Sequence, residues 1–169
     1  MSDSGPERVL DAAQPRAGDT VLELGAGLGA ATIAAHERIG DGWVIAVDPS
    51  VSALEQLLRL AHEAEANGIM YLVGDIEVLP LPNASVDVVV LRSVLAHAGD
   101  LDAAVAELAR VLRPGGRLSL CEPLDGAAGR ERLGADALVR RLAAAGFRDV
   151  APPAEDGEPP QLYLSAVRG

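Results

Sequence analysis

The chain has 169 residues, 49% of them hydrophobic and 23% charged, values that are typical of one folded globular domain. Its formal net charge is -11, and because an acidic surface repels phosphate backbones, nucleic acid is not an expected partner. The single cysteine, Cys121, excludes an internal disulfide, and no apolar run reaches the ~18 residues that span a bilayer. Residues 1–8 lack an apolar signal region, so we expect a cytoplasmic protein that does not bind membranes.

Apolar runs rich in β-forming residues alternate with helical patterns along the chain, which predicts βαβ units and a mostly parallel sheet. The runs are continuous rather than alternating, as expected for strands that are buried on both faces. The expected strands are residues 20–24, 43–47, 70–73, 86–91 and 117–121. The expected helices are an alanine-rich helix after Gly29 and the segments 50–67, 101–112 and 135–145.

The end of the chain has a different pattern. Residues 147–150 and 161–167 are predicted as two strands joined by a polar loop at 152–160, and such short connections join antiparallel strands. We therefore expect an α/β fold of the Rossmann-like type. Its mostly parallel sheet of about seven strands has one antiparallel strand near the C-terminus and helices on both faces. Residues 1–169 are expected to form a single domain, with a short N-terminal extension at 1–17.

A glycine-rich loop follows the first expected strand. The chain passes through Gly25, Gly27 and Gly29 and then enters a helix. Glycines at such a place allow a tight turn and let a ligand approach the backbone closely. The N–H groups at the start of the helix can bind an anionic group, although such a turn can also serve only to pack a helix on a strand.

Two acidic residues follow the next two strands. Asp48 ends the second strand, 23 residues after Gly25, where a carboxylate can accept bonds from both hydroxyls of a ribose. Asp75 follows the third strand, where a carboxylate can meet an exocyclic amine. Each acid alone could be a strand-end cap. Three such features in order, at strand ends that share one edge of a parallel sheet, predict a nucleoside-containing ligand.

A nicotinamide or flavin dinucleotide is the main alternative ligand. Gly25, Gly27 and Ala30 satisfy the loose dinucleotide pattern, and Asp48 fits its ribose-binding acid. Glu23 argues against this alternative, because it lies inside an apolar strand just before the loop and a buried carboxylate is costly without a partner. A cationic amino-acid group of the ligand would be such a partner, whereas a pyrophosphate would be repelled.

The segment Glu23-Leu-Gly-Ala-Gly-Leu-Gly29 resembles the first motif of class I methyltransferases that depend on S-adenosyl-L-methionine (SAM). Asp48 matches the ribose-binding acid of that family, and the pair Asp75-Ile76 matches its adenine contacts. Residues 86–91 resemble the fourth strand of the family, residues 112–117 resemble the turn before its fifth strand, and the tail resembles its reversed last strand. The resemblance covers about residues 18–169, and its nearest group includes quinone-biosynthesis C-methyltransferases and many small-molecule enzymes.

The resemblance implies SAM as the cofactor, with S-adenosyl-L-homocysteine as the product. It implies that Gly25 and Gly27 line the methionine part, that Glu23 orients the loop on the ammonium side, and that Arg92 supplies backbone contacts near the ammonium. The implied cofactor-binding residues are Glu23, Gly25, Ala26, Gly27, Asp48, Pro49, Asp75, Ile76 and Arg92.

The sulfonium of SAM already activates the methyl group, so a general base is needed only if the acceptor must lose a proton. His97, after the fourth strand, is the candidate base, and a structural histidine on a helix surface is the alternative. Glu122 and Asp125 follow the fifth strand and could orient an acceptor or be solvated loop acids. His36 and His62 are expected to be solvated, Cys121 is expected to be a buried thiol, and no metal site is predicted.

We therefore expect a SAM-dependent methyltransferase that acts on a small molecule. The alternatives are a SAM-binding protein of the same fold without transfer activity and a dinucleotide-dependent oxidoreductase. The segments before Thr20 and between Cys121 and Ala135 are too short for the helices that cover the substrate in relatives. The substrate site is therefore expected to be open, covered by a second subunit of a homodimer, or covered by a bulky acceptor.

Overall fold

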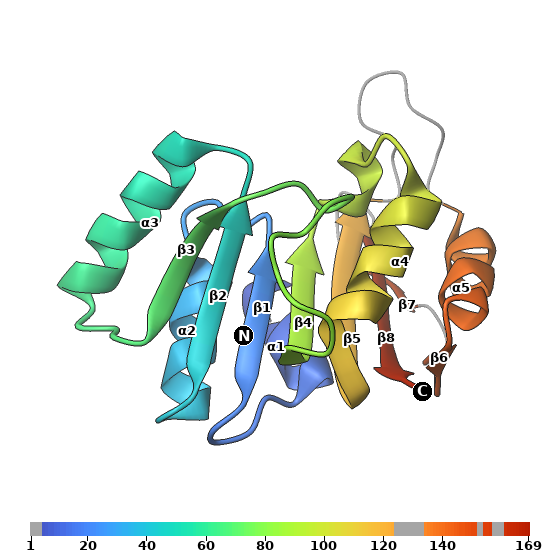
Figure 1. Cartoon of the computed structure of the whole chain (residues 1–169), viewed down its shortest axis with the longest axis horizontal. Helices are drawn as coiled ribbons and strands as arrows, with labels where there is room; N and C mark the ends of the chain where they lie inside the picture. The colour runs from blue at the N-terminus through green and yellow to red at the C-terminus, as the bar shows by residue number, and fades with distance from the viewer. Residues whose placement is uncertain (1–4, 124–133, 152–153, 157–160) are drawn as a thin grey trace.

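The computed structural model describes residues 5–123, 134–151, 154–156 and 161–169, and Figure 1 shows them as one sheet with helices on both faces. The helices are α1 (Gly5–Ala13), α2 (Ala30–Ile39), α3 (Val51–Glu63), α4 (Leu101–Val111) and α5 (Ala135–Ala144), with a short 3-10 helix, η1 (Leu95–His97). The strands are β1 (Thr20–Leu24), β2 (Trp43–Asp48), β3 (Ile69–Val73), β4 (Val86–Arg92), β5 (Leu112–Pro123), β6 (Phe147–Arg148), β7 (Ala154–Asp156) and β8 (Gln161–Arg168).

The order of the strands in the sheet is β3-β2-β1-β4-β5-β8-β6, and β7 pairs with β8 beside this path. Strands β1 to β5 are parallel, whereas β8 is antiparallel to β5, β6 and β7. This topology confirms the expected Rossmann-like sheet with its reversed strand near the C-terminus. The strand order reverses between β1 and β4, which is where open parallel sheets bind their ligands.

The side chains of the central strands pack into two layers of core. In β4, Val88 and Val90 lie in the core shared with α1 and α2, whereas Val89 and Leu91 lie in the core shared with α4 and α5. Burial on both faces is why these strands are continuous apolar runs in the sequence. Cys121 is also buried, in the α1 and α2 layer, as predicted for an apolar thiol, and burial raises the pKa of its thiol.

Two predicted segments differ in the structure. The stretch predicted as a polar loop at 152–160 contains the short strand β7, which pairs with the first residues of β8. The turn predicted at 112–117 belongs to β5, where Val86 pairs with Leu112 and Val88 pairs with Arg117, so residues 113–116 bulge outward. Both differences arise from pairing with another strand, β8 in the first case and β4 in the second.

From the sequence, residues 9–13 predict at most a short helix in the N-terminal extension, but the helix there is longer. Helix α1 begins at Gly5 and packs its buried residues Val9, Leu10 and Ala13 onto the sheet beside α2. Within the part of the chain that the structure describes, no helix is long and apolar enough to cross a bilayer.

Candidate functional site

Four predicted site segments meet at one edge of the sheet. The glycine loop follows β1, Asp48 ends β2, Asp75 follows β3 and Arg92 ends β4. Because these strands are parallel, their carboxyl ends lie at the same edge, which is the upper edge in Figure 1. The glycine loop is tied to the end of β2, since the Gly25 N–H donates to the Val47 carbonyl at 2.9 Å.

The three glycines of the loop have different roles. Gly25 and Gly29 have φ of +67° and +79°, and a Cβ would lie 2.5 Å from Val94 Cγ2 and 1.9 Å from Leu57 Cδ1 respectively. Packing therefore requires both glycines. Gly27 also has a positive φ, +51°, but its nearest neighbour would be the Gly25 carbonyl at 3.9 Å. Gly27 thus leaves open space where a side chain would otherwise lie, which a ligand could use to approach the loop.

A cavity of about 290 Å³ lies beside the glycine loop. Its lining comes from Glu23 in β1, from the loop and the first turn of α2, and from Arg92 and Ser93 after β4. This is the point where the strand order reverses, so the cavity occupies the usual binding position of the fold. Backbone N–H groups and both signs of charge suit the amino-acid part of SAM.

Glu23 is a buried carboxylic acid, with 6% of its surface exposed. Burial raises its pKa to about 7, while the Thr32 hydroxyl, which donates to it, and the nearby Arg92 charge act in the opposite direction. The partner that the buried acid was expected to require in a ligand is therefore supplied in part by the chain itself. Thr32, on α2, could not be recognised from the sequence because nothing marks it as facing Glu23.

Asp48 is also buried, and both of its oxygens are engaged. Oδ2 accepts from the Gly27 N–H at 3.0 Å, and Oδ1 accepts from the Ser50 N–H at 2.8 Å. The carboxylate therefore acts as a cap that joins the glycine loop to the start of α3. Each carboxylate oxygen can accept a second bond, so the predicted ribose contact stays compatible with this geometry. Pro49, beside it, is exposed.

Asp75 lies on the neighbouring strand end. It is exposed, and its Oδ1 accepts from the Glu77 N–H at 2.9 Å. Its Oδ2 accepts no hydrogen bond from the described residues. Ile76 is 8% exposed and lies in the core below. An exposed carboxylate above an apolar side chain is a suitable arrangement for the edge and face of an adenine ring.

Arg92 extends the site toward β5. It pairs in register with Cys121, and its guanidinium lies close enough to Glu23 to lower the pKa of that acid. Its Nε is buried and has no hydrogen-bond partner among the residues that the structure describes. The resemblance implied only backbone contacts for Arg92, whereas the structure also places its side chain in the wall of the cavity.

The structure corrects the prediction for Glu122. It was expected to orient an acceptor or to be a solvated loop acid, but it is fully buried. Its carboxylate accepts N–H bonds from Val94 at 2.9 Å, Leu95 at 3.0 Å and Ala96 at 3.1 Å. Burial raises the pKa of Glu122 above its ordinary value, although these three bonds act in the opposite direction. Glu122 therefore holds the segment after β4 in place. Asp125 lies outside the described residues.

The three histidines have different environments. His97 ends η1 and is exposed, with its Nδ1 2.9 Å from the Ser93 carbonyl, so the structure places it beside the segment that Glu122 holds. His62 is exposed, as expected. His36 was expected to be solvated but is half-buried, and its Nδ1 has no partner among the described residues. Within the described ranges, no cluster of His, Cys, Asp and Glu could hold a metal ion.

Several proteins with similar sequences are named methyltransferases. A profile of the family described as "Methyltransferase domain" matches residues 22–120, more than half of the chain. An uncharacterised methyltransferase of Mycobacterium tuberculosis is 41% identical over 117 residues, which cover 69% of this chain and 45% of that protein. A ubiquinone/menaquinone biosynthesis C-methyltransferase of Shewanella frigidimarina is 32% identical over 115 residues, which cover 67% and 46%. The chain thus spans less than half the length of these curated relatives.

Solved structures show the same fold. Geranyl diphosphate C-methyltransferase from Streptomyces coelicolor, in complex with Mg2+, geranyl diphosphate and S-adenosyl-L-homocysteine, matches with a TM-score of 0.85 at 18% identity. The match covers 100% of this chain and 81% of that one. The predicted fold and the predicted family are both confirmed. The family profile, and a sheet whose strand ends carry the family's motifs in order, show that this chain belongs to the methyltransferase-domain family.

Proposed function

We propose that this chain binds SAM and transfers its methyl group to a small-molecule acceptor. The observation that carries the proposal is the convergence of the glycine loop, Asp48 and Asp75 at the carboxyl ends of β1, β2 and β3. When bound, SAM supplies a sulfonium that activates the methyl group for in-line displacement. The chain then has to bind and orient SAM and the acceptor and to exclude water from them, rather than perform covalent chemistry of its own.

Each part of the site has a proposed task. Gly27 and Ala26 present backbone to the methionine part, and Glu23 and Arg92 orient its charged end from the cavity wall. Asp48, with Pro49 beside it, accepts hydrogen bonds from the ribose hydroxyls. Asp75 and Ile76 hold adenine at the end of β3. The buried positions of Glu23 and Asp48 support these tasks, because buried charged groups make stronger contacts than solvated ones.

We propose His97 as the general base for acceptors that must lose a proton. A neutral imidazole that donates from Nδ1 to the Ser93 carbonyl holds its lone pair at Nε2, which is the arrangement that a base requires. Replacing His97 with Asn tests this role. The base hypothesis expects the rate of methyl transfer to fall for acceptors that must lose a proton and to stay unchanged for acceptors that need not, whereas an equal effect on both would leave His97 with a structural role.

Calorimetry with S-adenosyl-L-homocysteine and with NAD tests the cofactor. Binding of the first ligand and no response to NAD is the expected result, and Asp75→Ala should weaken that binding in a folded protein. Binding of NAD alone would establish the dinucleotide alternative. Tight binding of S-adenosyl-L-homocysteine, with no turnover against a panel of hydroxyl, amine, thiol and carbon acceptors, would favour a SAM-binding protein without transfer activity.

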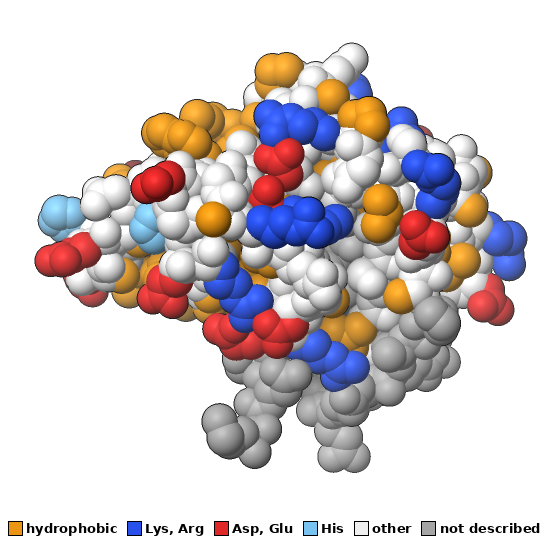
Figure 2. Space-filling view, turned by 90° about the horizontal axis from the view of Figure 1, so that it is seen from below, with side chains coloured by type: hydrophobic (Ala, Val, Ile, Leu, Met, Phe, Trp, Pro, Cys, Tyr) orange, Lys and Arg blue, Asp and Glu red, His pale blue; other side chains and the backbone are white. Residues whose placement is uncertain are grey.

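We expect an acceptor other than nucleic acid, because the net charge of the chain is -11. Figure 2 shows the face at the amino ends of the parallel strands, where Arg side chains alternate with Asp and Glu rather than forming a basic patch. Arg113 pairs with Asp87 there, and Arg117 pairs with Asp19.

A cytoplasmic location and a homodimer that covers the substrate site belong to the same proposal. Solution scattering with and without ligand would test the homodimer.

A further inference from the structure

The loop between β3 and β4, residues 74–85, carries both proposed adenine contacts. Its first part is a closed turn from Asp75 to Val78. The Val78 N–H donates to the Asp75 carbonyl at 3.1 Å, and the Glu77 N–H donates to Asp75 Oδ1 at 2.9 Å. Asp75 and Val78 also form an antiparallel bridge. The turn therefore moves as one unit, and whatever holds its ends determines where Asp75 points.

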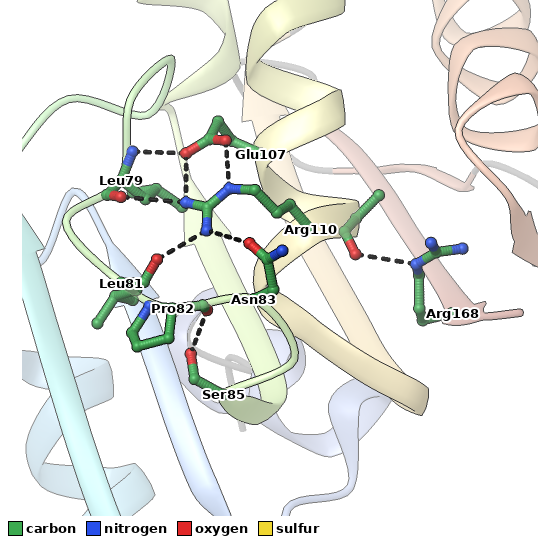
Figure 3. Close-up of polar contacts among 9 residues, drawn as sticks. Leu79, Leu81, Pro82, Asn83, Ser85, Glu107, Arg110 and Arg168 are labelled. Carbon is green, nitrogen blue, oxygen red and sulfur yellow. Dashed lines mark hydrogen bonds and ion pairs between the residues drawn. The ribbon is translucent and has the colours of Figure 1, made fainter.

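One end of this turn is anchored to the last turns of α4 through Leu79. The Leu79 N–H donates to Glu107 Oε2 at 2.7 Å, and the Leu79 carbonyl accepts from Arg110 Nη2 at 3.1 Å. Figure 3 shows both side chains reaching from α4 to the loop. The Leu79 side chain is 4% exposed and lies in the same core as Ile76. The Leu79 carbonyl also accepts from the Leu81 N–H at 2.8 Å. The N–H of this buried residue is thus bound by Glu107, and its carbonyl is bound by both Arg110 and Leu81.

Arg110 also binds the loop further along. Its Nη1 donates to the Leu81 carbonyl at 2.7 Å and to Asn83 Oδ1 at 2.9 Å (Figure 3). Glu107 holds the guanidinium in place, with Nε to Oε1 at 2.5 Å and Nη2 to Oε2 at 2.7 Å. These bonds hold the pKa of Glu107 below its ordinary value. A planar guanidinium with five donors can satisfy such a set at once, and a lysine cannot.

The other end of the turn is anchored at the beginning of α4. Glu77 Oε1 accepts from the Asp100 N–H at 3.0 Å and from the Gly99 N–H. Asp100 is the N-cap of α4. The turn from Asp75 to Val78 is therefore fixed to both ends of one helix, and that helix belongs to the buried core on this side of the sheet.

We propose that Arg110 is a positioning residue for the adenine end of SAM: it holds Leu79, and through it the turn that presents Asp75 and Ile76. The inference rests on the proposed function, because it assumes that this edge of the sheet binds SAM. Loss of Arg110 removes its bonds to the Leu79 and Leu81 carbonyls and leaves Glu107 without the partner that fixes it. The turn is then held less firmly at Leu79, while Glu77 still binds the beginning of α4. Asp75 then loses its fixed position relative to the exocyclic amine of adenine.

The test compares two ligands by calorimetry. One is S-adenosyl-L-homocysteine, and the other is its purine analogue, in which hydrogen replaces the exocyclic amine. The wild-type chain should prefer the first ligand by about tenfold, since a hydrogen bond to a carboxylate is lost with the amine. In Arg110→Ala the affinity for S-adenosyl-L-homocysteine should fall by about tenfold and that for the analogue by less than about twofold, so the preference disappears.

Two further variants make the test specific. Arg110→Lys should not restore the preference, because it lacks the fork of donors. Arg38→Ala is the matched control. Arg38 is about as exposed as Arg110 (28% against 30% for the side chains) and pairs with Glu7 and Asp11, but it lies on α2, away from the loop. Its loss should lower stability and leave the ligand preference unchanged.

A folded Arg110→Ala protein that keeps the wild-type preference overturns the proposal. If that variant does not fold, Glu107→Gln decides instead, since it weakens the hold on Arg110 while keeping an oxygen for the Leu79 N–H. Loss of the preference there supports the proposal, and an unchanged preference overturns it. A wild-type chain that binds neither ligand would contradict the proposed function itself, which is a different result.

Discussion

Glu23→Gln should change how the stability of the protein depends on pH. The wild-type acid is buried, and its pKa rises from 4.5 to about 7, chiefly through loss of solvation. An acid with a raised pKa in the folded state destabilises that state when it is ionised and not when it is protonated. Its presence therefore costs stability progressively as the pH rises from about 4.5 to about 7, and the cost persists above that range.

The size of the effect follows from the shift. Each pKa unit corresponds to about 1.4 kcal/mol, so the shift of Glu23 amounts to roughly 3 kcal/mol between the two ends of the range. Glutamine does not titrate, and its amide oxygen can still accept from the Thr32 hydroxyl. Its buried N–H groups add an offset that does not depend on pH. The free energy of unfolding of the variant minus that of the wild type should therefore increase by roughly 3 kcal/mol from about pH 4.5 to about pH 8.

Urea unfolding of both proteins across this range, without ligand, measures the difference. Glu107→Gln is a control of opposite sign, because hydrogen bonds from Arg110 lower the pKa of Glu107. Its stabilising contribution is present above the ordinary glutamate pKa and is lost as the pH falls through the lowered value. A difference curve for Glu23→Gln that is flat with pH would refute the reasoning, since it would mean that Glu23 ionises in the folded chain as easily as in water.

Four other substitutions should have measurable effects. Asp48→Ala should weaken binding of S-adenosyl-L-homocysteine by at least ~1 kcal/mol in calorimetry and lower the unfolding free energy by about 1–3 kcal/mol, because two backbone N–H groups lose their acceptor. Gly29→Ala should lower the unfolding free energy by about 2–4 kcal/mol, since its Cβ would lie 1.9 Å from Leu57 Cδ1. Gly115→Ala, which has the same φ of +79° but open space around it, should cost only about 1–2 kcal/mol, and equal losses would contradict the packing argument. Glu122→Ala should speed hydrogen exchange of the backbone N–H groups of residues 94–96, and unchanged protection there would show that Glu122 does not hold this segment.

The main strands were accessible from local pattern, whereas their order in the sheet was not predicted. Buried parallel strands are continuous apolar runs, so β1, β2 and β4 could be placed within a residue or so. The glycine loop, Asp48 and Asp75 could be assigned to one edge, because the carboxyl ends of parallel strands share an edge whatever the details of packing. The short strand β7 could not be predicted, since Ala154, Glu155 and Asp156 form a strand only by pairing with β8.

The sequence by itself determined the fold class and the family, and it indicated the loop and strand ends that we propose for the ligand, because these depend on periodicity and on motifs of adjacent residues. Only the tertiary structure decided which groups satisfy the buried charges. Glu23 receives its hydrogen bond from Thr32, Glu122 binds three N–H groups near β4, and Arg110 binds the loop before β4. These partners are 9, 28 and 29 residues apart. Residues at such separations meet only when the chain has folded, and local pattern does not encode which of many polar groups will lie within 3 Å of each other.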